Sequence, residues 1–351
     1  MSMKLKPLNA QTLVITGATS GSGLAIATRA AHRGARVMLL ARSETGLAAV
    51  CEWIGRSGGE ADYRVTEVGD PDAMAAAAEA AIRRFGGFDT WVNNAGVGVY
   101  SRLEALPLDE HHLIFRTNYW GVVHGSLAAV AHFRTRGEPG ALINIGSINS
   151  DMASPLLSAY AASKHAVKGF TDSLRLELMS ESAPVSVTLV KPSAIGTPFP
   201  QNARNRTGQR ARLPLPVYSP ELVADAVLHA AEHPIRSITV GGSGRLQVLA
   251  AAVAPAIFDQ VSARMGPALI ERRRPEASAM GNLEKPSTGP QSVDGRQKGR
   301  RISLYAPAAL NPLAARTLLV GLALAATVRL RLTFKNPQPQ RGAAKRRRSP
   351  G

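Results

Sequence analysis

Tyr160 and Lys164 are the two residues whose types and spacing most directly indicate chemistry, because they stand four apart in the run YAASK. On a helix, residues four apart lie on one face, so a phenol and an ammonium would share one site. A free phenol has a pKa of about 10, and a nearby cation favours the phenolate. Tyr160 is therefore a candidate general base for alcohol oxidation and general acid for carbonyl reduction. By itself, the pair is also compatible with chance on a half-exposed helix.

Two further polar residues can take part in the same chemistry. Ser147 follows the apolar run ALINI (141–145), at the edge of the predicted sheet where ligands of open α/β folds bind. Its hydroxyl is a candidate hydrogen-bond partner for a substrate oxygen. Asn118 interrupts an otherwise apolar helical stretch. Its amide either holds a water that relays protons from Lys164 or satisfies a buried backbone group.

A glycine-rich turn, TGATSGSG, follows the first apolar run TLVIT (12–16) directly and precedes a helical stretch. Glycines are needed where the backbone turns sharply and lets a pyrophosphate approach a helix N-terminus, whose free N–H groups favour anions. The spacing G-x-x-x-G-x-G differs from the G-x-G-x-x-G dinucleotide fingerprint, and glycines in such turns are often purely steric. Its place after the first strand nevertheless favours a nucleotide site. The candidate cofactor-binding residues of this turn are Gly17, Thr19, Ser20, Gly21, Ser22 and Gly23.

The end of the second apolar run, RVMLL (36–40), bears on the choice of cofactor. An acidic residue at this point would bind the adenosine ribose hydroxyls of NAD. Ala41 cannot do so, whereas Arg42 can pair with a 2′-phosphate. We therefore expect NADP(H) as the preferred cofactor, with NAD(H) as the alternative if Arg42 is only a solvated surface residue.

Short strand-like runs alternate with longer Ala-rich amphipathic stretches from residue 12 to about residue 240. This alternation predicts βαβ units, and the continuously apolar runs are typical of strands buried on both faces. The expected fold class is α/β, a Rossmann-like, doubly wound parallel seven-stranded sheet with helices on both faces. The expected strands are 12–16, 36–40, 62–68, 89–93, 141–145, 185–190 and 237–240, and the expected helices include 22–33, 71–85, 109–136, 158–180 and 219–232.

Taken together, these motifs resemble the short-chain dehydrogenase/reductase family, in its single-domain branch. The resemblance covers roughly residues 8–245 and includes the glycine turn, NNAG (93–96), the gap of 13 between Ser147 and Tyr160, and the segment KPSAIGTPF. It implies that Tyr160, Lys164, Ser147 and Asn118 form the catalytic set. It also implies cofactor contacts, with Lys164 at the nicotinamide ribose and Thr197 at the carboxamide. The further cofactor residues that it implies are Asn94, Ala95, Gly96, Tyr160, Pro192 and Ile195.

The chain departs from the family pattern at three positions. Ser22 replaces the usual apolar residue of the glycine turn, Ser193 replaces a glycine after Pro192, and Glu67 stands where an Asp near adenine is usual. None of these changes removes a catalytic group. The expected activity is therefore hydride transfer between NADP(H) and a carbonyl or secondary alcohol. The alternative is a catalytically silent NADP-binding sensor or scaffold that uses its basic tail to contact a membrane or nucleic acid.

Substrate recognition is expected in the loop 194–218, which contains apolar residues and four arginines. The arginines either form a basic rim that admits an anionic or carrier-linked substrate or simply solvate an exposed loop. The substrate is expected to be a small carbonyl or alcohol compound. The sequence leaves open whether that compound is carrier-linked or a free lipophilic ketone, steroid or sugar. The four arginines are Arg204, Arg206, Arg210 and Arg212.

The positive charge of the chain is concentrated at its C-terminal end. Of the net charge of +17, residues 271–351 hold 17 Lys/Arg and 4 Asp/Glu, a net of +13. We therefore expect a catalytic domain over 1–270, a flexible basic linker over 271–302, and a disordered basic tail over 335–351. The tail has no aromatic partners for its KRRR run, so nucleic-acid binding is not expected.

A short apolar segment, 303–334, lies between the predicted linker and tail. Its run TLLVGLALAATV has 12 residues, fewer than the roughly 20 needed to span a membrane. The segment is expected either to associate weakly with a membrane surface or to pack against the body or a partner subunit. No secretory signal, disulfide framework or metal site is expected, so the predicted location is cytoplasmic, with peripheral membrane contact as the alternative. Homodimers or homotetramers are implied by the resemblance alone.

Overall fold

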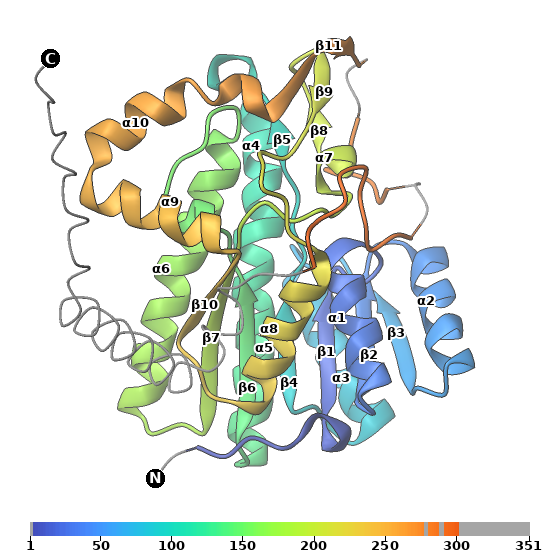
Figure 1. Cartoon of the computed structure of the whole chain (residues 1–351). Coiled ribbons are helices and arrows are strands. Elements are labelled where there is room, and N and C mark those ends of the chain that lie inside the picture. The colour runs from blue at the N-terminus through green and yellow to red at the C-terminus, as the bar shows by residue number, and fades with distance from the viewer. Residues whose placement is uncertain (1–2, 277–279, 288–290, 302–351) are drawn as a thin grey trace, which may run out of the picture. The chain divides into compact units, whose positions relative to one another are not determined.

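A seven-stranded parallel sheet with helices on both faces forms the body of the protein (Figure 1). The computed structural model describes residues 3–276, 280–287 and 291–301. The strand order is β10-β7-β6-β4-β1-β2-β3, so the direction of strand addition reverses between β1 and β4. Ligands of doubly wound folds bind at the carboxyl ends of the strands beside such a reversal. The strands are β1 Thr12–Thr16, β2 Arg36–Ala41, β3 Ala61–Val65, β4 Thr90–Asn93, β6 Gly140–Ile145, β7 Val185–Pro192 and β10 Ser237–Val240.

The strands of this sheet are apolar because helices cover both of its faces. Every residue of β1, β4 and β6 is buried, which explains why these stretches read as continuous apolar runs rather than as alternating ones. The predicted doubly wound parallel sheet is confirmed. The strand ends differ slightly from the prediction: β3 stops at Val65 and β7 continues to Pro192.

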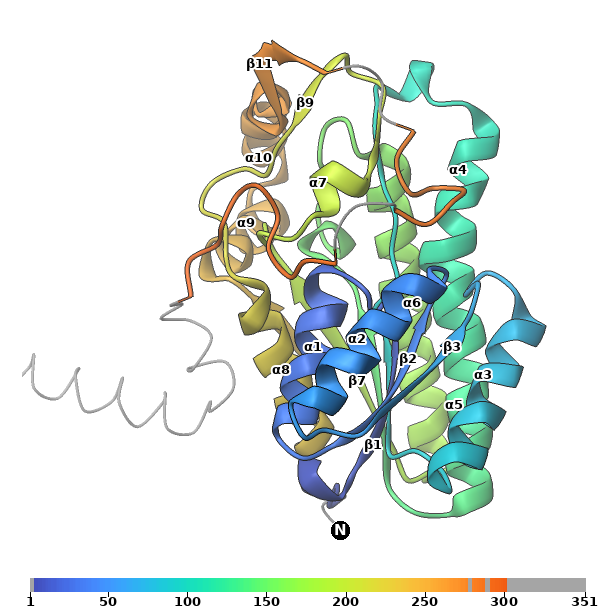
Figure 2. The same cartoon turned by 90° about the vertical axis from the view of Figure 1, so that its right-hand side faces the viewer.

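Helices α1, α2 and α8 cover one face of the sheet, and α3, α5 and α6 cover the other (Figure 2). Local sequence signals set their ends. At α3 the Asp70 carboxylate accepts a hydrogen bond from the Asp72 N–H at 2.9 Å, Pro71 is the first helical residue, and Gly86 ends the helix with a φ of 79°. The helices are α1 Gly21–His32, α2 Glu44–Arg56, α3 Pro71–Phe85, α4 Leu108–Phe115, α5 Gly121–Arg136, α6 Ser158–Ser180, α7 Phe199–Asn202, α8 Pro220–Glu232, α9 Gly242–Val253 and α10 Pro255–Ala263.

A π-helical turn divides the region 109–136, for which the sequence predicts one continuous helix. The turn, Arg116–Trp120, separates α4 from α5. A π-helical turn accommodates an extra residue and is often found at functional sites. Asn118 lies in this turn and is fully buried, so the irregularity affects the direction in which its amide points.

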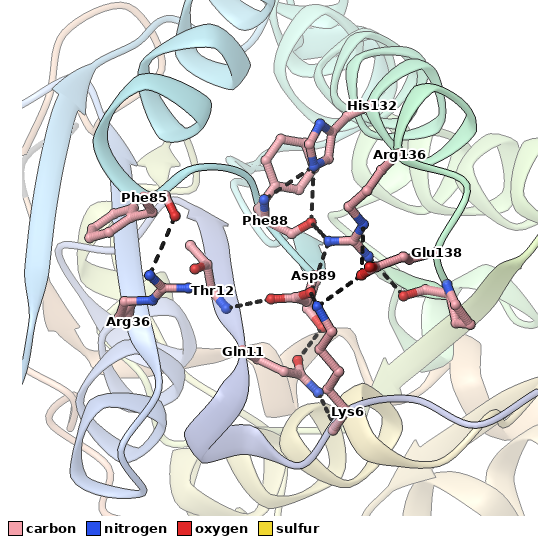
Figure 3. A network of polar contacts seen from close by, with 12 residues as sticks. Lys6, Gln11, Thr12, Arg36, Phe85, Phe88, Asp89, His132, Arg136 and Glu138 are labelled. Carbon is pink, nitrogen blue, oxygen red and sulfur yellow. Dashed lines mark hydrogen bonds and ion pairs between the residues drawn. The ribbon is translucent and has the colours of Figure 1, made fainter.

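A network of polar side chains closes the amino edge of the sheet (Figure 3). The buried Asp89 carboxylate accepts a hydrogen bond from the Thr12 N–H at the start of β1 and another from the Arg136 guanidinium at the end of α5, both at 2.8 Å. The Lys6 ammonium lies 3.0 Å from Asp89 and 3.0 Å from Glu138. This network joins a strand, a helix and the N-terminal segment at the edge opposite the carboxyl ends of the strands.

The region predicted as a flexible linker, 271–302, packs on the domain over its described parts. Strand β11 (Ile270–Pro275) pairs antiparallel with β9 (Gln209–Ala211). Leu283 is 2% exposed and belongs to an apolar cluster of the domain. The prediction of a linker rested on the lack of apolar periodicity, which does not prevent a segment from docking through its backbone. The remaining short strands are β5 Val99–Tyr100 and β8 Arg204–Asn205.

The predicted apolar segment 303–334 and basic tail 335–351 lie outside the described residues. Among the helices that the structure describes, none combines the length and the apolar composition that a membrane span requires.

Candidate active site

A cavity of about 350 Å³ lies at the carboxyl edge of the sheet, beside the reversal between β1 and β4. It brings together the predicted catalytic and cofactor-binding residues with one exception, Asn118. The predicted residues that line it are Gly17, Thr19, Ser20, Gly21, Ser22, Gly23, Arg42, Asn94, Ala95, Gly96, Ser147, Tyr160, Lys164, Pro192, Ile195 and Thr197.

The glycine turn is shaped so that two of its positions accept no side chain. Gly17 has a φ of +67°, which L-residues rarely adopt. A Cβ on Gly23 would lie 2.1 Å from the Gly17 carbonyl oxygen. The Ser20 side chain at the start of α1 makes no capping hydrogen bond, so it leaves the first N–H groups of the helix to other partners. A close-packed turn before a helix N-terminus fits the pyrophosphate of a dinucleotide.

The turn after β4 is held against the end of β1 by Thr16. The Thr16 hydroxyl accepts hydrogen bonds from the backbone N–H groups of Asn94 at 2.9 Å and Ala95 at 3.0 Å. The Asn94 side chain returns a hydrogen bond to the Thr16 carbonyl at 2.9 Å. The two turns that border the cavity are therefore fixed relative to each other before any ligand binds.

Tyr160 and Ser147 lie next to each other on the cavity wall and share a hydrogen bond. Tyr160 comes from the first turn of α6, and its ring packs at 5.4 Å from that of Phe199. Burial raises the pKa of Tyr160 to about 12, and a hydrogen bond with Ser147 opposes this shift. Ser147 is itself fixed, because its Oγ accepts a hydrogen bond from the Asn149 N–H at 3.1 Å. The sequence predicts a lowered phenol pKa, but in the protein by itself desolvation of the phenolate outweighs the stabilising contacts.

Lys164 lies one helical turn after Tyr160 and is 3% exposed. Its Nζ donates a hydrogen bond to the Ile145 carbonyl at the end of β6, at 2.8 Å, and lies 5.8 Å from the centre of the Tyr160 ring. Burial lowers the pKa of Lys164 to about 8. The ammonium therefore reaches the same cavity as the phenol, in the arrangement that the YAASK spacing predicts.

Asn118 supports the site from behind the cavity wall. Its Oδ1 accepts a hydrogen bond from the Val97 N–H at 2.8 Å, and its Nδ2 donates to the Val97 carbonyl and to the Ser163 hydroxyl, both at 3.0 Å. Of the two interpretations that the sequence leaves open, these contacts correspond to the amide that satisfies a buried backbone group. They also connect the turn after β4 to α6, which bears Tyr160 and Lys164.

Arg42 reaches the cavity at the end of β2, as predicted, but its guanidinium contacts groups of its own chain. It donates hydrogen bonds to the backbone carbonyls of Asn282, Leu283 (3.2 Å) and Glu284 (3.3 Å). The Glu67 carboxylate lies 3.6 Å from it. No local sequence signal predicts the three carbonyl partners, because they belong to the region predicted as a linker.

The two other departures from the family pattern also border the cavity. Ser22 lies in the glycine turn, and Ser193 follows Pro192 at the end of β7. The Ser193 Oγ is buried and has no hydrogen-bond partner among the described residues.

The four arginines of the substrate loop are bound to protein groups rather than free at a rim. Both Arg204 and Arg206 pair with the buried Glu110, at 2.5 Å and 3.0 Å. Arg210 lies 3.6 Å from Glu276. Arg212 donates a hydrogen bond to a backbone carbonyl at 3.1 Å. The four arginines therefore form neither a basic rim nor a purely solvated loop, because each is bound to a protein group. These partners come from distant parts of the sequence.

The wall beyond Tyr160 is largely apolar and includes residues that the sequence analysis did not single out. They come from β5, from the segment between β6 and α6, and from the stretch that follows α10. Their apolar character alone does not distinguish them from core residues, so no sequence signal identifies them. These lining residues are Tyr100, Met152, Pro155, Leu157, Met265 and Leu269.

The fold and this cavity define a class, the Rossmann-fold oxidoreductases. A family model described as short chain dehydrogenase matches residues 11–208. The chain belongs to the short-chain dehydrogenase/reductase family, whose members related to it are named oxidoreductases and dehydrogenases acting on alcohol groups.

Relatives and solved structures agree with this assignment. The chain is 42% identical over 260 residues to the uncharacterized oxidoreductase YxnA of Bacillus subtilis. The aligned region covers 74% of this chain and 73% of that protein. It is 36% identical over 233 residues to the 1-deoxy-11-beta-hydroxypentalenate dehydrogenase of Streptomyces avermitilis. This alignment covers 65% of this chain and 82% of that protein. A short chain dehydrogenase/reductase from Burkholderia phymatum, solved in complex with NAD, has the same fold, with a TM-score of 0.65, 24% identity and coverage of 72% and 96%.

Proposed function

We propose that the protein is an NADP(H)-dependent oxidoreductase that interconverts a ketone or aldehyde and the corresponding alcohol, with Tyr160 as the proton-transferring residue. One observation carries the proposal. Tyr160, Ser147 and Lys164 converge on the cavity that also contains the glycine turn. Bound NADP(H) supplies the donor or acceptor of the hydride.

The roles of the three side chains follow from their positions. In carbonyl reduction, the Ser147 hydroxyl holds the substrate oxygen and the Tyr160 O–H bond breaks as its proton passes to that oxygen. In alcohol oxidation, the proton returns to the Tyr160 oxygen. Because burial disfavours the phenolate, the ammonium of Lys164 on the same helix face is needed to stabilise it. Asn118 assists as a positioning residue, since it connects the Val97 backbone to α6.

The chemistry of the cavity favours an uncharged, lipophilic substrate over an anionic one. The side chains around Tyr160 are mainly apolar, as at Leu157, Phe199 and Leu269. Arg204 and Arg206, which could attract an anion, share Glu110, and Arg204 also pairs with Glu284 at 3.2 Å, so two carboxylates balance the two guanidinium charges. A ketone or secondary alcohol on an apolar ring or chain would lose less hydration energy on entering this site than a phosphorylated or carboxylated compound.

We also propose that the protein forms homodimers or homotetramers. Large apolar side chains on α5 and α6 are more than half exposed: Leu127, Leu176 and Met179. Light scattering of the purified full chain tests this, and a monomer at micromolar concentration would contradict it. Weak membrane association through the segment 303–334 stays a prediction.

The test of the activity compares Tyr160→Phe with the wild-type protein. We expect Tyr160→Phe to reduce the rate of NADPH-dependent reduction of neutral ketones by about 10²- to 10⁴-fold, the range for loss of a general acid, while NADPH binding stays within about threefold. Tyr63→Phe is the matched control, because it also removes a phenol hydroxyl, but from the edge strand β3. Undiminished turnover in Tyr160→Phe would show that another group supplies the proton.

The same assay separates the enzyme from the alternative function. Tight binding of NADPH without turnover of any ketone in the panel would favour a cofactor-binding sensor or scaffold. Failure to bind either NADPH or NADH would contradict both.

A further inference from the structure

Two described stretches near the C-terminus, 280–287 and 291–301, lie along the cofactor cleft, and we call them together the strap. The strap contributes four residues to the wall of the cavity. Its contacts follow the cleft from the end of β2, past the start of α1, to the loop after β7. The strap residues that line the cavity are Asn282, Pro286, Ser287 and Gln291.

One end of the strap is anchored in the domain by an apolar side chain. Leu283 is 2% exposed and packs in a cluster with Val97, Val99 and Ile114. Removal of this apolar side chain from water favours the docked position of the strap. The Asn282 N–H donates a hydrogen bond to the Asn202 carbonyl at 2.7 Å. This end therefore docks through its side chain as well as its backbone.

The other end is anchored by backbone hydrogen bonds and by glycines that allow close approach. The Gly295 N–H donates to the Gly196 carbonyl at 2.8 Å, and the Arg300 N–H donates to the Val217 carbonyl at 2.9 Å. A Cβ on Gly299 would lie 2.0 Å from the carbonyl carbon of Tyr218, so this position accepts no side chain while the strap is docked.

At its first end and midway along, the strap occupies N–H groups that would bind the phosphates of a dinucleotide. The Ser292 carbonyl accepts a hydrogen bond from the Gly21 N–H, the first amide of α1, at 2.8 Å. The carbonyls of residues 282–284 accept hydrogen bonds from Arg42. A carbonyl oxygen and a phosphate oxygen are both acceptors, so they compete for the same N–H groups. The amide and the guanidinium are thus satisfied by the chain itself at two separate points of one cleft.

We propose that the strap is an autoinhibitory segment that competes with the phosphates of NADP(H) for Gly21 and Arg42. The proposal rests on the proposed function, since it concerns the same cofactor site. The strap must leave both groups before the cofactor binds fully, so the apparent affinity for NADP(H) is reduced by the fraction of molecules with the strap docked. By linkage, bound NADP(H) weakens the docking of the strap by the same factor.

The first experiment releases the strap at each end in the full-length protein. Gly299→Val introduces a side chain where none fits, and Leu283→Asp places a charge in the apolar cluster. Their matched controls introduce the same side chains at exposed neighbours, Lys298→Val and Lys285→Asp. The dissociation constant for NADPH is measured by fluorescence titration. We expect it to fall at least tenfold in both releasing variants and to stay within twofold of wild type in both controls.

The second experiment needs no variant. Hydrogen exchange of the wild-type protein is measured at the strap amides of Asn282, Gly295 and Arg300, with and without saturating NADPH. We expect exchange at these amides to become faster when NADPH binds, because the strap is then displaced.

Three outcomes would overturn the proposal. Weaker NADPH binding in the releasing variants, with slower exchange of the strap in the wild type, would show that the strap is a lid that retains the cofactor. Unchanged dissociation constants with unchanged exchange would show that strap and cofactor are independent, and the proposed function would stand. Absence of NADPH binding in the wild type and in both releasing variants would contradict the proposed function as well.

Discussion

The Lys164 ammonium donates a hydrogen bond to the Ile145 carbonyl at 2.8 Å, two residues before Ser147 along the chain. The contact connects α6, which bears Tyr160 and Lys164, to the end of β6, which precedes Ser147, and so fixes the spacing of the proposed catalytic side chains. Among the described residues, no acidic side chain forms an ion pair with Lys164. A buried cation beside a neutral acceptor is costly, and burial accordingly lowers the pKa of Lys164 to about 8.

Lys164→Met is expected to stabilise the protein while it abolishes turnover. At pH 7 the lysine is charged in both the folded and the unfolded state, so the folded state bears the whole desolvation cost. A pKa lowered from about 10.5 to about 8 corresponds to at most about 3 kcal/mol, so we expect the free energy of unfolding to rise by about 2 kcal/mol. The gain should disappear as the pH rises from 8 to 10.5, where the wild-type folded state holds a neutral lysine. Urea unfolding at pH 7 and at pH 10.5 measures it.

Lys168→Met provides the control for this prediction. Lys168 lies one turn further along α6, is 39% exposed and pairs with Asp172 at 3.1 Å. Its replacement should not stabilise the protein at pH 7. A loss of stability in Lys164→Met at pH 7 would mean that the hydrogen bond to Ile145 outweighs the burial of the charge.

Arg42→Ala is expected to reduce the preference for NADPH over NADH. Loss of a charged hydrogen-bond donor to a phosphate costs about 1.5–3 kcal/mol, so the dissociation constant for NADPH should rise about 10- to 100-fold relative to that for NADH. The ratio of the two constants is the decisive quantity, because release of the strap from Arg42 would change both constants together. Fluorescence titration measures the ratio, with Arg56→Ala on the surface of α2 as the control. Equal changes for both cofactors would exclude Arg42 as a 2′-phosphate ligand.

Asp89→Asn is expected to destabilise the protein without affecting the chemistry of the site. The change leaves the guanidinium of Arg136, only 17% exposed, without a buried anion, which costs about 3 kcal/mol. The network lies at the amino edge of the sheet, opposite the cavity, so kcat of the folded fraction should stay unchanged (Figure 3). Urea unfolding checks the loss, and Glu138→Gln, which alters the exposed end of the same network, should have little effect. Equal stability of Asp89→Asn and wild type would contradict the role of Asp89 as the buried anion that stabilises Arg136.

Much of the fold and of the candidate site is encoded in local sequence. The strands and most helices follow from apolar runs, from caps such as Asp70 and from turn glycines such as Gly86, because these signals act over a few residues. The pair Tyr160 and Lys164 falls on one face of α6 because helix periodicity fixes the direction of side chains four apart. The glycine turn follows β1 for an equally local reason, namely that Gly17 needs a positive φ.

The helix irregularity at Asn118 depends on contacts that the local sequence does not contain. Local propensity predicts one helix over 109–136, whereas the amide of Asn118 bonds to Val97 and Ser163, 21 and 45 residues away in the chain. The π-helical turn is compatible with these contacts, which form only once β4 and α6 have packed. The same holds for the pKa of Tyr160, since its desolvation comes from the assembled cavity.

The sequence by itself determined the α/β fold, the family motifs and the motif residues that meet at the cavity, because each depends on short-range patterns. Only the tertiary structure decided what those residues touch. Arg204 pairs with Glu110 across 94 residues, and Arg42 meets the carbonyls of 282–284 across about 240. A polar, glycine-containing segment has the same composition whether it is a free linker or a docked strap. The difference lies in backbone hydrogen bonds and in one buried leucine, Leu283, whose partners come from distant parts of the chain.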